Sequence, residues 1–307
     1  MPKTDRYQQV NDLIIQGLQN GVGPWTRPWR TNSSDEMNGS VPFNPVTGSC
    51  YSGANPWMLS ITSSINGWTD PRFCTFKQMA SKGWRIKDGQ ARSKGGPGPS
   101  LVYFWGTFTK EEEIDGEKVK KQVRFLKTYS VWNFEQLEGP DAWITPEPTE
   151  AEPTEAKHTM AWDVCEAWPV PTSHGGGRAF YSPSADRIQL PKVEDFNSEE
   201  DYLSTRFHEM AHSAGHKTRL ARDFSGRFGD QAYAFEELIA ECTAANLMAA
   251  CDVVSSGTLR DDHVAYLDAW IQCIKEDKFT IFSAFKQAKL AADAILENSN
   301  QAALAAK

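Results

Sequence analysis

The sequence predicts an α+β fold of two domains, in which a mixed α/β N-terminal domain precedes a mainly α-helical C-terminal domain with a small β-sheet. Three observations lead to this prediction. Residues 138–157 are rich in proline, glutamate and threonine and offer little to bury, as in a linker. Before them, residues 101–129 contain two stretches rich in aromatic and β-branched side chains, which favour strands. After them, apolar residues recur mainly with helical spacing. The predicted domains are therefore residues 1–137 and 158–307.

Capping and turn residues delimit the elements of the N-terminal domain. Thr75 is placed to cap a short helix, and Gly83 follows that helix closely. Asp115 and Gly116 form a turn signal between two strands. We expect helices over residues 4–20, 56–65 and 76–81, and a hairpin of strands over residues 101–109 and 119–129.

The C-terminal domain opens with shorter elements and continues as a series of helices. Ser198 is a suitable N-cap and Gly215 a suitable stop for a helix over residues 199–214. A second apolar helix is expected from about residue 233 to residue 251, and residues 174–177 are expected to form a turn. The remaining predicted elements are a helix over residues 160–168, a short hairpin of residues 179–181 and 188–190, and helices over residues 261–276 and 279–297.

Charge is distributed unevenly between the two domains. Residues 1–137 contain 17 Lys+Arg and 12 Asp+Glu, a net charge of +5, whereas the rest of the chain has a net charge of −13. This asymmetry indicates a basic module joined to an acidic one. The six cysteines show no CxxC spacing, as in the reduced thiols of a cytosolic protein. We expect no signal peptide and no membrane span, because no apolar run reaches about 18 residues.

A HExxH motif at residues 208–212 is the strongest functional signal in the chain. Residues four apart lie on one face of a helix, so His208 and His212 can bind the same divalent ion, most often zinc. Glu209 lies beside that ion without being needed as a ligand, which is the position of a general base acting on water. We therefore predict a Zn²⁺ site, or a site for another divalent metal, with Glu209 as the catalytic carboxylate.

A catalytic zinc site usually has three protein ligands, so a third ligand has to come from elsewhere. His216 would lie about 12 Å from His208 on a continued helix, and Thr218 occupies the position where a metzincin has histidine. Glu237 and Glu241 are four residues apart on the next predicted helix. One of them can bind the metal while the other orients a ligand histidine. We favour Glu237 as the ligand and keep Glu241 as the alternative.

Basic and aromatic residues are interleaved in the N-terminal domain. This pattern is typical of a surface that binds single-stranded DNA or RNA through counterion release and base stacking. The candidates lie after the first helix, around the helix of residues 76–81 and on the second strand of the hairpin. They are Trp25, Arg27, Trp29, Arg30, Lys77, Lys82, Trp84, Arg85, Lys87, Arg92, Lys94 and Arg124.

Several motifs together resemble the ArdC-like antirestriction proteins of conjugative plasmids. In the N-terminal domain these motifs are NPVTG at 44–48, YSGAN at 51–55, TFKQ at 75–78 and VWNFEQ at 131–136. In the C-terminal domain they are AFY at 179–181, DRIQLP at 186–191, TRFHEMAH at 205–212, GHKTRL at 215–220 and YAFEELIAE at 233–241. The resemblance covers nearly the whole chain outside the linker, and departures such as Trp132 in place of phenylalanine are small.

This resemblance implies an N-terminal single-stranded-DNA-binding domain and a C-terminal zincin-like metallopeptidase domain. It implies a plasmid-encoded protein of the bacterial cytoplasm that protects incoming plasmid DNA from host restriction. It also implies that His208, His212 and Glu237 bind the metal and that Glu209 is the catalytic carboxylate. The expected partners are single-stranded DNA and, as protein targets, subunits of host restriction enzymes.

Two functions from different classes fit these residues. An enzyme would use the metal site to cleave a peptide bond in a DNA-bound target such as a restriction subunit. A binding protein would instead coat single-stranded DNA and block restriction sterically, with a structural or vestigial metal site. A nuclease fits less well, because a single HExxH site lacks the carboxylate cluster of two-metal nucleases.

Overall fold

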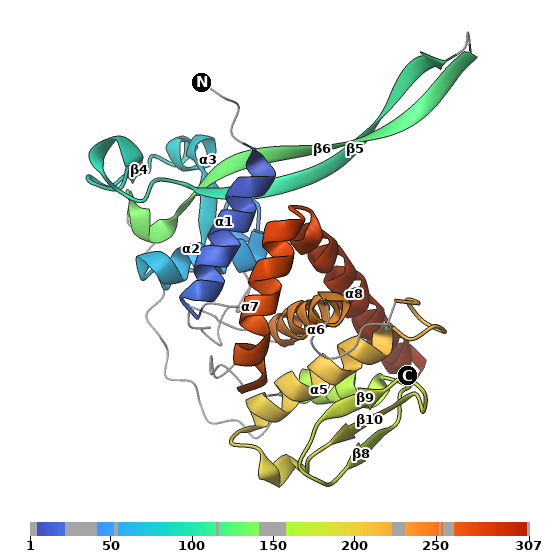
Figure 1. Cartoon of the computed structure of the whole chain (residues 1–307). Helices are drawn as coiled ribbons and strands as arrows, with labels where there is room; N and C mark the ends of the chain where they lie inside the picture. The colour runs from blue at the N-terminus through green and yellow to red at the C-terminus, as the bar shows by residue number, and fades with distance from the viewer. Residues whose placement is uncertain are drawn as a thin grey trace.

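The structure, a computed structural model, describes residues 5–21, 42–51, 55–114, 117–140, 158–222, 231–251, 253 and 261–305. It confirms the α+β fold and the layout in two parts (Figure 1). The first part contains helices α1 to α3 and a sheet built on a long hairpin. The second part contains helices α4 to α8 and a small sheet. The domain boundaries on either side of residues 138–157 stay a prediction.

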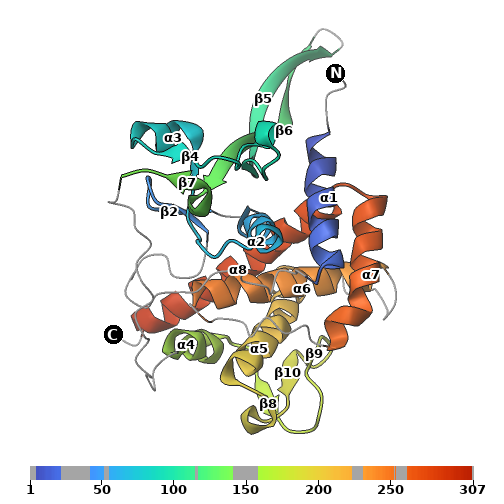
Figure 2. The ribbon, with the colours of Figure 1, turned by 90° about the vertical axis from the view of Figure 1, so that its left-hand side faces the viewer.

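The sheet of the first part has the strand order β3-β6-β5, with antiparallel neighbours throughout. β5 (Ser100–Ile114) and β6 (Glu117–Asn133) extend beyond the predicted strands and form a hairpin that projects past the helices (Figures 1 and 2). The predicted turn at Asp115 and Gly116 lies outside the described residues. The other elements here are α1 (Arg6–Gln19), α2 (Asn55–Asn66), α3 (Phe76–Ser81), β1 (Phe43–Asn44), β2 (Ser49–Cys50), β3 (Phe73–Thr75), β4 (Arg85–Ile86) and β7 (Leu137–Glu138).

Side-chain caps explain where two of these helices begin. At the start of α1, Oδ1 of Asp5 accepts a hydrogen bond of 3.0 Å from the backbone N–H of Tyr7. At α3, Thr75 and Gln78 form a capping box in which each side chain accepts a hydrogen bond from the backbone N–H of the other. Such bonds satisfy donors that the first turn of a helix leaves unpaired. The predicted helices of this part therefore lie close to the observed ones.

The sheet of the second part has the strand order β8-β10-β9, and β9 and β10 contact α5. β10 pairs parallel with β8 and antiparallel with β9. His174, which was expected in a turn, is the last residue of β8 and pairs with Leu190. Among the described helices, none combines the length and the apolar character that a membrane crossing needs. The elements of this part are α4 (Thr159–Ala167), β8 (Thr172–His174), β9 (Phe180–Ser182), β10 (Arg187–Leu190), α5 (Glu199–Ala214), α6 (Gln231–Ala250), α7 (Asp261–Glu276) and α8 (Thr280–Ala305).

One hydrophobic core joins the two parts of the chain. Val10 and Ile14 of α1 and Trp57 of α2 pack in the same cluster as apolar side chains of α6, α7 and α8. Within this shared core, Trp270 of α7 is fully buried, and its indole N–H donates to the backbone carbonyl of Ala234 in α6 at 2.9 Å. A second cluster packs α5 against α4, α8 and the small sheet. Because α6 contributes to both clusters, it connects the shared core to α5.

Candidate metal centre

The two histidines of the HExxH motif lie on α5, which begins and ends where its sequence predicts. Ser198 caps its N-terminus with a hydrogen bond of 3.1 Å from a backbone N–H of the first turn, and Gly215 follows its last residue. His208 and His212 are about one helical turn apart, and their Nε2 atoms lie 3.0 Å from each other. Phe207 is fully buried in the cluster beneath α5. Its burial fixes the rotation of the helix and therefore the direction of both imidazoles.

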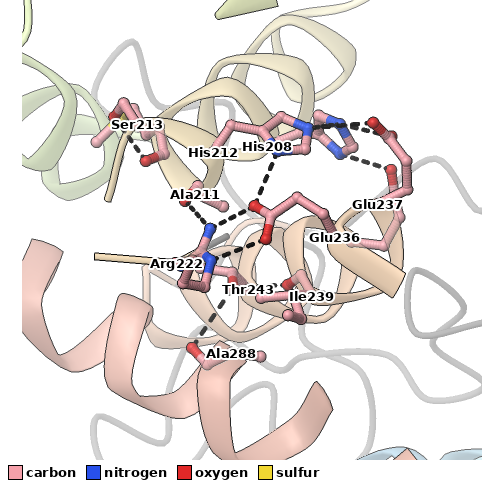
Figure 3. Close-up of polar contacts among 12 residues, drawn as sticks. His208, Ala211, His212, Ser213, Arg222, Glu236, Glu237, Ile239, Thr243 and Ala288 are labelled. Atoms are coloured by element: carbon pink, nitrogen blue, oxygen red, sulfur yellow. Dashed lines mark hydrogen bonds and ion pairs between the residues drawn. The ribbon is translucent and has the colours of Figure 1, made fainter. Parts of the chain in front are cut away.

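Helix α6 brings a carboxylate to these imidazoles. Oε2 of Glu237 lies 3.4 Å from Nε2 of His208, and Oε1 lies 3.4 Å from Nε2 of His212 (Figure 3). One candidate ligand atom from each of the three residues lies within 4.8 Å of the others. Leu238 and Ile239 are buried in the shared core, which turns Glu237 toward α5. The structure thus brings together the three residues that the sequence nominated as ligands.

The candidate donor atoms lie close enough together for one ion to bind all three residues. Ligand atoms bound to zinc at about 2.0–2.1 Å in a tetrahedron lie about 3.3–3.4 Å from one another. The two Nε2 atoms lie 3.0 Å apart, and each lies 3.4 Å from a different oxygen of the Glu237 carboxylate, which is close to this range. Two imidazole nitrogens and a carboxylate oxygen suit zinc and several other divalent metals. Three protein ligands leave one coordination position for water or substrate, as in catalytic sites.

Each imidazole is also held at its second ring nitrogen, and Figure 3 shows Glu236 and Arg222 on the His212 side. Nδ1 of His208 lies 2.7 Å from Oε1 of Glu241, and Nδ1 of His212 lies 3.1 Å from Oε1 of Glu236. Arg222 in turn anchors Glu236, because its Nη2 and Nε donate to the two carboxylate oxygens at 2.6 and 2.9 Å. A carboxylate at Nδ1 keeps the proton there and directs the Nε2 lone pair toward a metal.

The roles of these supporting residues were only partly predictable. Glu241, the alternative ligand, lies behind His208, whereas Glu237 contacts both Nε2 atoms. Sequence reasoning gave no role to Glu236 or Arg222. Glu236 directly precedes Glu237 in an otherwise apolar segment, and two adjacent carboxylates there indicate that buried cationic partners are needed. Arg222 carries no comparable signal, because it follows the end of α5 and approaches Glu236 only through the fold.

Burial and the neighbouring carboxylates shift the pKa values of the two histidines in opposite directions. Burial alone lowers the pKa of His208, but Glu241 and Glu237 outweigh it and raise that pKa to about 9. Burial is likewise outweighed at His212, where Glu236 and Glu237 hold the pKa well above its ordinary value. Burial raises the pKa of Glu237, but the two histidines outweigh it and hold that pKa below its usual range. A metal ion that binds here therefore displaces protons from the imidazoles.

Two further residues of this region were considered from the sequence. Glu209 follows His208 on α5 and is buried, with 6% of its surface exposed. His216 lies outside the ligand group, because its Nδ1 is 2.8 Å from the hydroxyl of Thr218 and 3.9 Å from the Asp186 carboxylate. This placement agrees with the prediction that His216 lies too far from His208 to share its ion.

The structure describes only some of the candidate DNA-binding residues. Trp25, Arg27, Trp29 and Arg30 lie outside the described residues, and Arg124 is placed only by its pairing with Thr107. Trp84 needs a correction: it is 6% exposed and packs edge-on against Phe134, with ring centroids 5.2 Å apart. Because protein covers this ring, Trp84 is a core residue here and does not offer a face to a base. Its place among basic residues in the sequence gave no sign of this burial.

The basic candidates on and after α3 are all exposed. Arg85 forms an ion pair of 2.6 Å with Glu138, and Lys94 forms one of 2.8 Å with Asp88. Exposed pairs of this kind contribute about 0–1 kcal/mol, so a phosphate can replace the carboxylate. The exposed candidates are Lys77, Lys82, Arg85, Lys87, Arg92 and Lys94.

Removing the carboxylate behind either histidine should weaken metal binding. We expect Glu241→Gln and Glu236→Gln each to lower the affinity for zinc about 10–100-fold, because the ligand imidazole loses the group that orients it. Glu236→Gln should also lower stability, because Arg222 loses a buried partner at 2.6 Å. Competition with a chromogenic chelator measures the affinity, and Glu276→Gln on α7 is an exposed control. Wild-type zinc affinity in both variants would contradict the assigned roles.

Two family models match the chain, one on each side of the proline-rich segment. One is described as the N-terminal domain of anti-restriction factor ArdC and matches residues 4–132. The other is described as a zincin-like metallopeptidase and matches residues 161–287. The chain is also similar to two crystal structures of the antirestriction ArdC protein from the R388 plasmid. The metal-free structure is 32% identical, with a TM-score of 0.73, and the match covers 97% of this chain and 98% of that one.

The Mn(II)-bound structure of that R388 protein is 30% identical, with a TM-score of 0.71 and coverage of 96% of this chain and 98% of that one. DNA primase TraC of Escherichia coli is 33% identical over 94% of this chain but only 27% of its own length. The chain thus spans about a quarter of that primase, and 20% of a second TraC primase. The uncharacterized protein y4eC of Sinorhizobium fredii is 31% identical over 94% of this chain and 91% of its own. The similarity therefore extends over both parts of the fold.

Proposed function

This chain belongs to the ArdC family of antirestriction proteins, and from that premise we propose that it protects incoming plasmid DNA from restriction in the bacterial cytoplasm. In this proposal the first part binds single-stranded DNA. The second part is a zinc metallopeptidase that cleaves a DNA-bound protein, such as a subunit of a restriction enzyme. DNA held by the first part would bring such a target close to the peptidase site of the same molecule.

One observation carries the peptidase proposal: His208, His212 and Glu237 converge within bonding range of one ion, and Glu209 follows His208 on the same helix. This arrangement supplies three ligands, an open coordination position and a carboxylate that need not bind the metal. Zinc is the metal we propose, because two imidazoles and one carboxylate form the donor set of many zinc peptidases. The Mn(II)-bound structure of the R388 protein supports the proposal of a divalent ion.

The side chains of the chain itself would carry the proton transfers. A bound zinc ion would supply a Lewis acid that polarises a peptide carbonyl and eases the deprotonation of water. Glu209 would accept the proton of the attacking water and later deliver it to the leaving amine. Glu241 and Glu236 would keep the two imidazoles in their binding orientation throughout, because each holds an Nδ1 atom.

A second candidate function rests on the closure of the site. Glu209 is 6% exposed, His208 7% and Glu237 8%, so the site offers little surface to a polypeptide substrate. In that case the ion would stabilise the fold, and the bound protein would shield single-stranded DNA from restriction by steric exclusion alone. The two functions differ in whether protection needs the general base.

A Glu209→Gln variant tests the peptidase proposal. The substitution keeps the size of the side chain and all three ligands but removes the group that accepts a proton. We expect protection of DNA entering a restricting host to fall about 10²-fold or more, since general-base catalysis contributes about 10²–10⁴-fold. Zinc content and affinity for single-stranded DNA should stay at the wild-type level. The protection assay is the transfer frequency of an unmodified plasmid into restricting and non-restricting recipients.

An exposed glutamate provides the matched control for this experiment. Glu194→Gln removes a carboxylate that forms only a surface contact of 3.8 Å with Lys192, so its transfer frequency should equal that of the wild type. Full protection by Glu209→Gln would rule out proteolysis as the mechanism and leave steric exclusion. Loss of protection together with loss of DNA binding would point to damaged folding, which the zinc content then reports.

A further inference from the structure

The sheet of the first part carries an unusual number of exposed aromatic side chains. Among the described residues, the three most exposed aromatics are Phe76 at 58%, Phe104 at 55% and Tyr129 at 49%. Phe104 belongs to β5 and Tyr129 to β6, and Phe76 is the first residue of α3, directly after β3. All three therefore lie on or beside the β3-β6-β5 sheet. None of them is among the candidate DNA-binding residues named from the sequence.

The strand register places two of these aromatics on one face. Phe104 pairs with Lys127 and Val102 pairs with Tyr129, and directly paired residues share a face. Residues two apart in a strand also share a face, so Phe104, Lys127 and Tyr129 lie together there. Phe104 and Tyr129 are diagonal neighbours, which are about 7–8 Å apart in an antiparallel sheet. At this spacing both aromatic side chains are within reach of one ligand.

The inner end of this face is anchored in a hydrophobic core. Val102, the partner of Tyr129, is 7% exposed and packs with Val131, Phe73 and Leu59. The exposed rings thus begin where the buried part of the same face ends, and their backbone is held by that core. Farther out along the hairpin, Lys110 pairs with Lys121 in the register. Lys110 is an even number of residues from Phe104, and Lys121 is an even number of residues from Lys127. The register positions of this face therefore combine aromatic and basic residues.

We propose that the face defined by Phe104, Tyr129 and Lys127 is a binding platform for single-stranded DNA, with the two rings stacking on a base and the lysine contacting the backbone. This inference rests on the single-stranded-DNA binding proposed above and specifies where it occurs. Exposed aromatic rings are sequence-tolerant stacking surfaces, because every base has a π-face. Duplex DNA does not offer unstacked bases, so the platform should favour single strands. The lysine supplies the charge complementarity to the phosphates.

The double variant Phe104→Ala/Tyr129→Ala tests the platform in the full-length chain. Fluorescence anisotropy with a labelled oligo(dT) should show a loss of affinity of at least about tenfold, since each stacked base contributes strongly to binding. The slope of log affinity against log salt should stay unchanged, because no charge is removed. Lys127→Ala should instead reduce the magnitude of that slope by about 0.7, the value expected for one contact to a single-stranded phosphate.

Matched substitutions elsewhere serve as controls. Phe180→Ala removes an exposed aromatic of β9, and Lys286→Ala removes an exposed lysine of α8, so both should bind oligo(dT) like the wild type. Tyr129→Phe keeps the ring and should keep the affinity, which separates lost stacking from a misfolded sheet. Wild-type affinity in the double variant would overturn the platform while leaving single-stranded-DNA binding intact. Failure of the wild-type protein to bind oligo(dT) would overturn both proposals.

Discussion

Replacing Glu237 with glutamine should lower the affinity for zinc about 10²–10³-fold. A structural zinc site with four protein ligands binds with about 10–16 kcal/mol, so an equal share for one ligand is about 2.5–4 kcal/mol. Glu237 is also the negatively charged member of the ligand group, and its carboxylate lies 3.4 Å from both Nε2 atoms. Its neutralisation leaves two imidazoles to hold a dication. The expected loss exceeds that for Glu241 or Glu236, which hold only the imidazoles.

Thermal unfolding provides a second readout of the same variant. A ligand present at 100 times its dissociation constant stabilises a protein by about 2.7 kcal/mol, so zinc should raise the Tm of the wild type. The increase should disappear in Glu237→Gln at the same zinc concentration and persist in the control Glu276→Gln. If Glu237→Gln binds zinc like the wild type while Glu241→Gln does not, then Glu241 is the third ligand and the assignment is reversed.

Replacing Trp270 with alanine should reduce the free energy of unfolding by about 3–5 kcal/mol, the range for a large aromatic removed from a core. Trp270 is fully buried, and its indole N–H donates to the carbonyl of Ala234 at 2.9 Å. It packs in the cluster that also receives α1 and α2, so its loss opens a cavity in this shared core. Urea unfolding followed by circular dichroism measures the effect.

Two further variants bracket the effect of the Trp270 substitution. Trp270→Phe keeps much of the packing but loses the hydrogen bond, so it should cost less than the alanine variant and remain measurable if that variant does not fold. Leu304→Ala on α8 removes a side chain that is 73% exposed and should change stability by less than about 0.5 kcal/mol. A cost below about 1 kcal/mol for Trp270→Ala would contradict a core shared by both parts.

Local helix geometry made the ligand group predictable from the sequence. His208 and His212 face the same way because they are four residues apart on one helix, and Glu237 follows on the next one. The link between Glu236 and Arg222 was not predictable, because it depends on the path of the chain between α5 and α6. Trp84 failed as a stacking candidate for a similar reason. Its neighbours in sequence are basic, but its neighbour in space is Phe134.

The hairpin shows a different limit of sequence reasoning. Charged residues near its tip are depleted in strands, so the predicted strands end at residue 109 and begin again at residue 119. In the structure the pairing continues, with Glu111 opposite Lys120 and Glu113 opposite Lys118. Opposite charges at paired positions favour a ladder that each strand alone does not indicate. Cross-strand register is non-local information, and it is the same information that places Phe104 and Tyr129 on one face.

The two sides of α6 have a consequence for any shortened version of this protein. Glu237 and Glu241 lie toward the imidazoles, while Leu238, Ile239 and Cys242 pack in the cluster that α1 and α2 complete. A truncated chain beginning at residue 158 would retain every ligand in its sequence. It would nevertheless lack the side chains that back α6 and set the angle from which its carboxylates approach the ion. Separate tests of the two proposed activities therefore call for point substitutions in the intact chain rather than for isolated fragments.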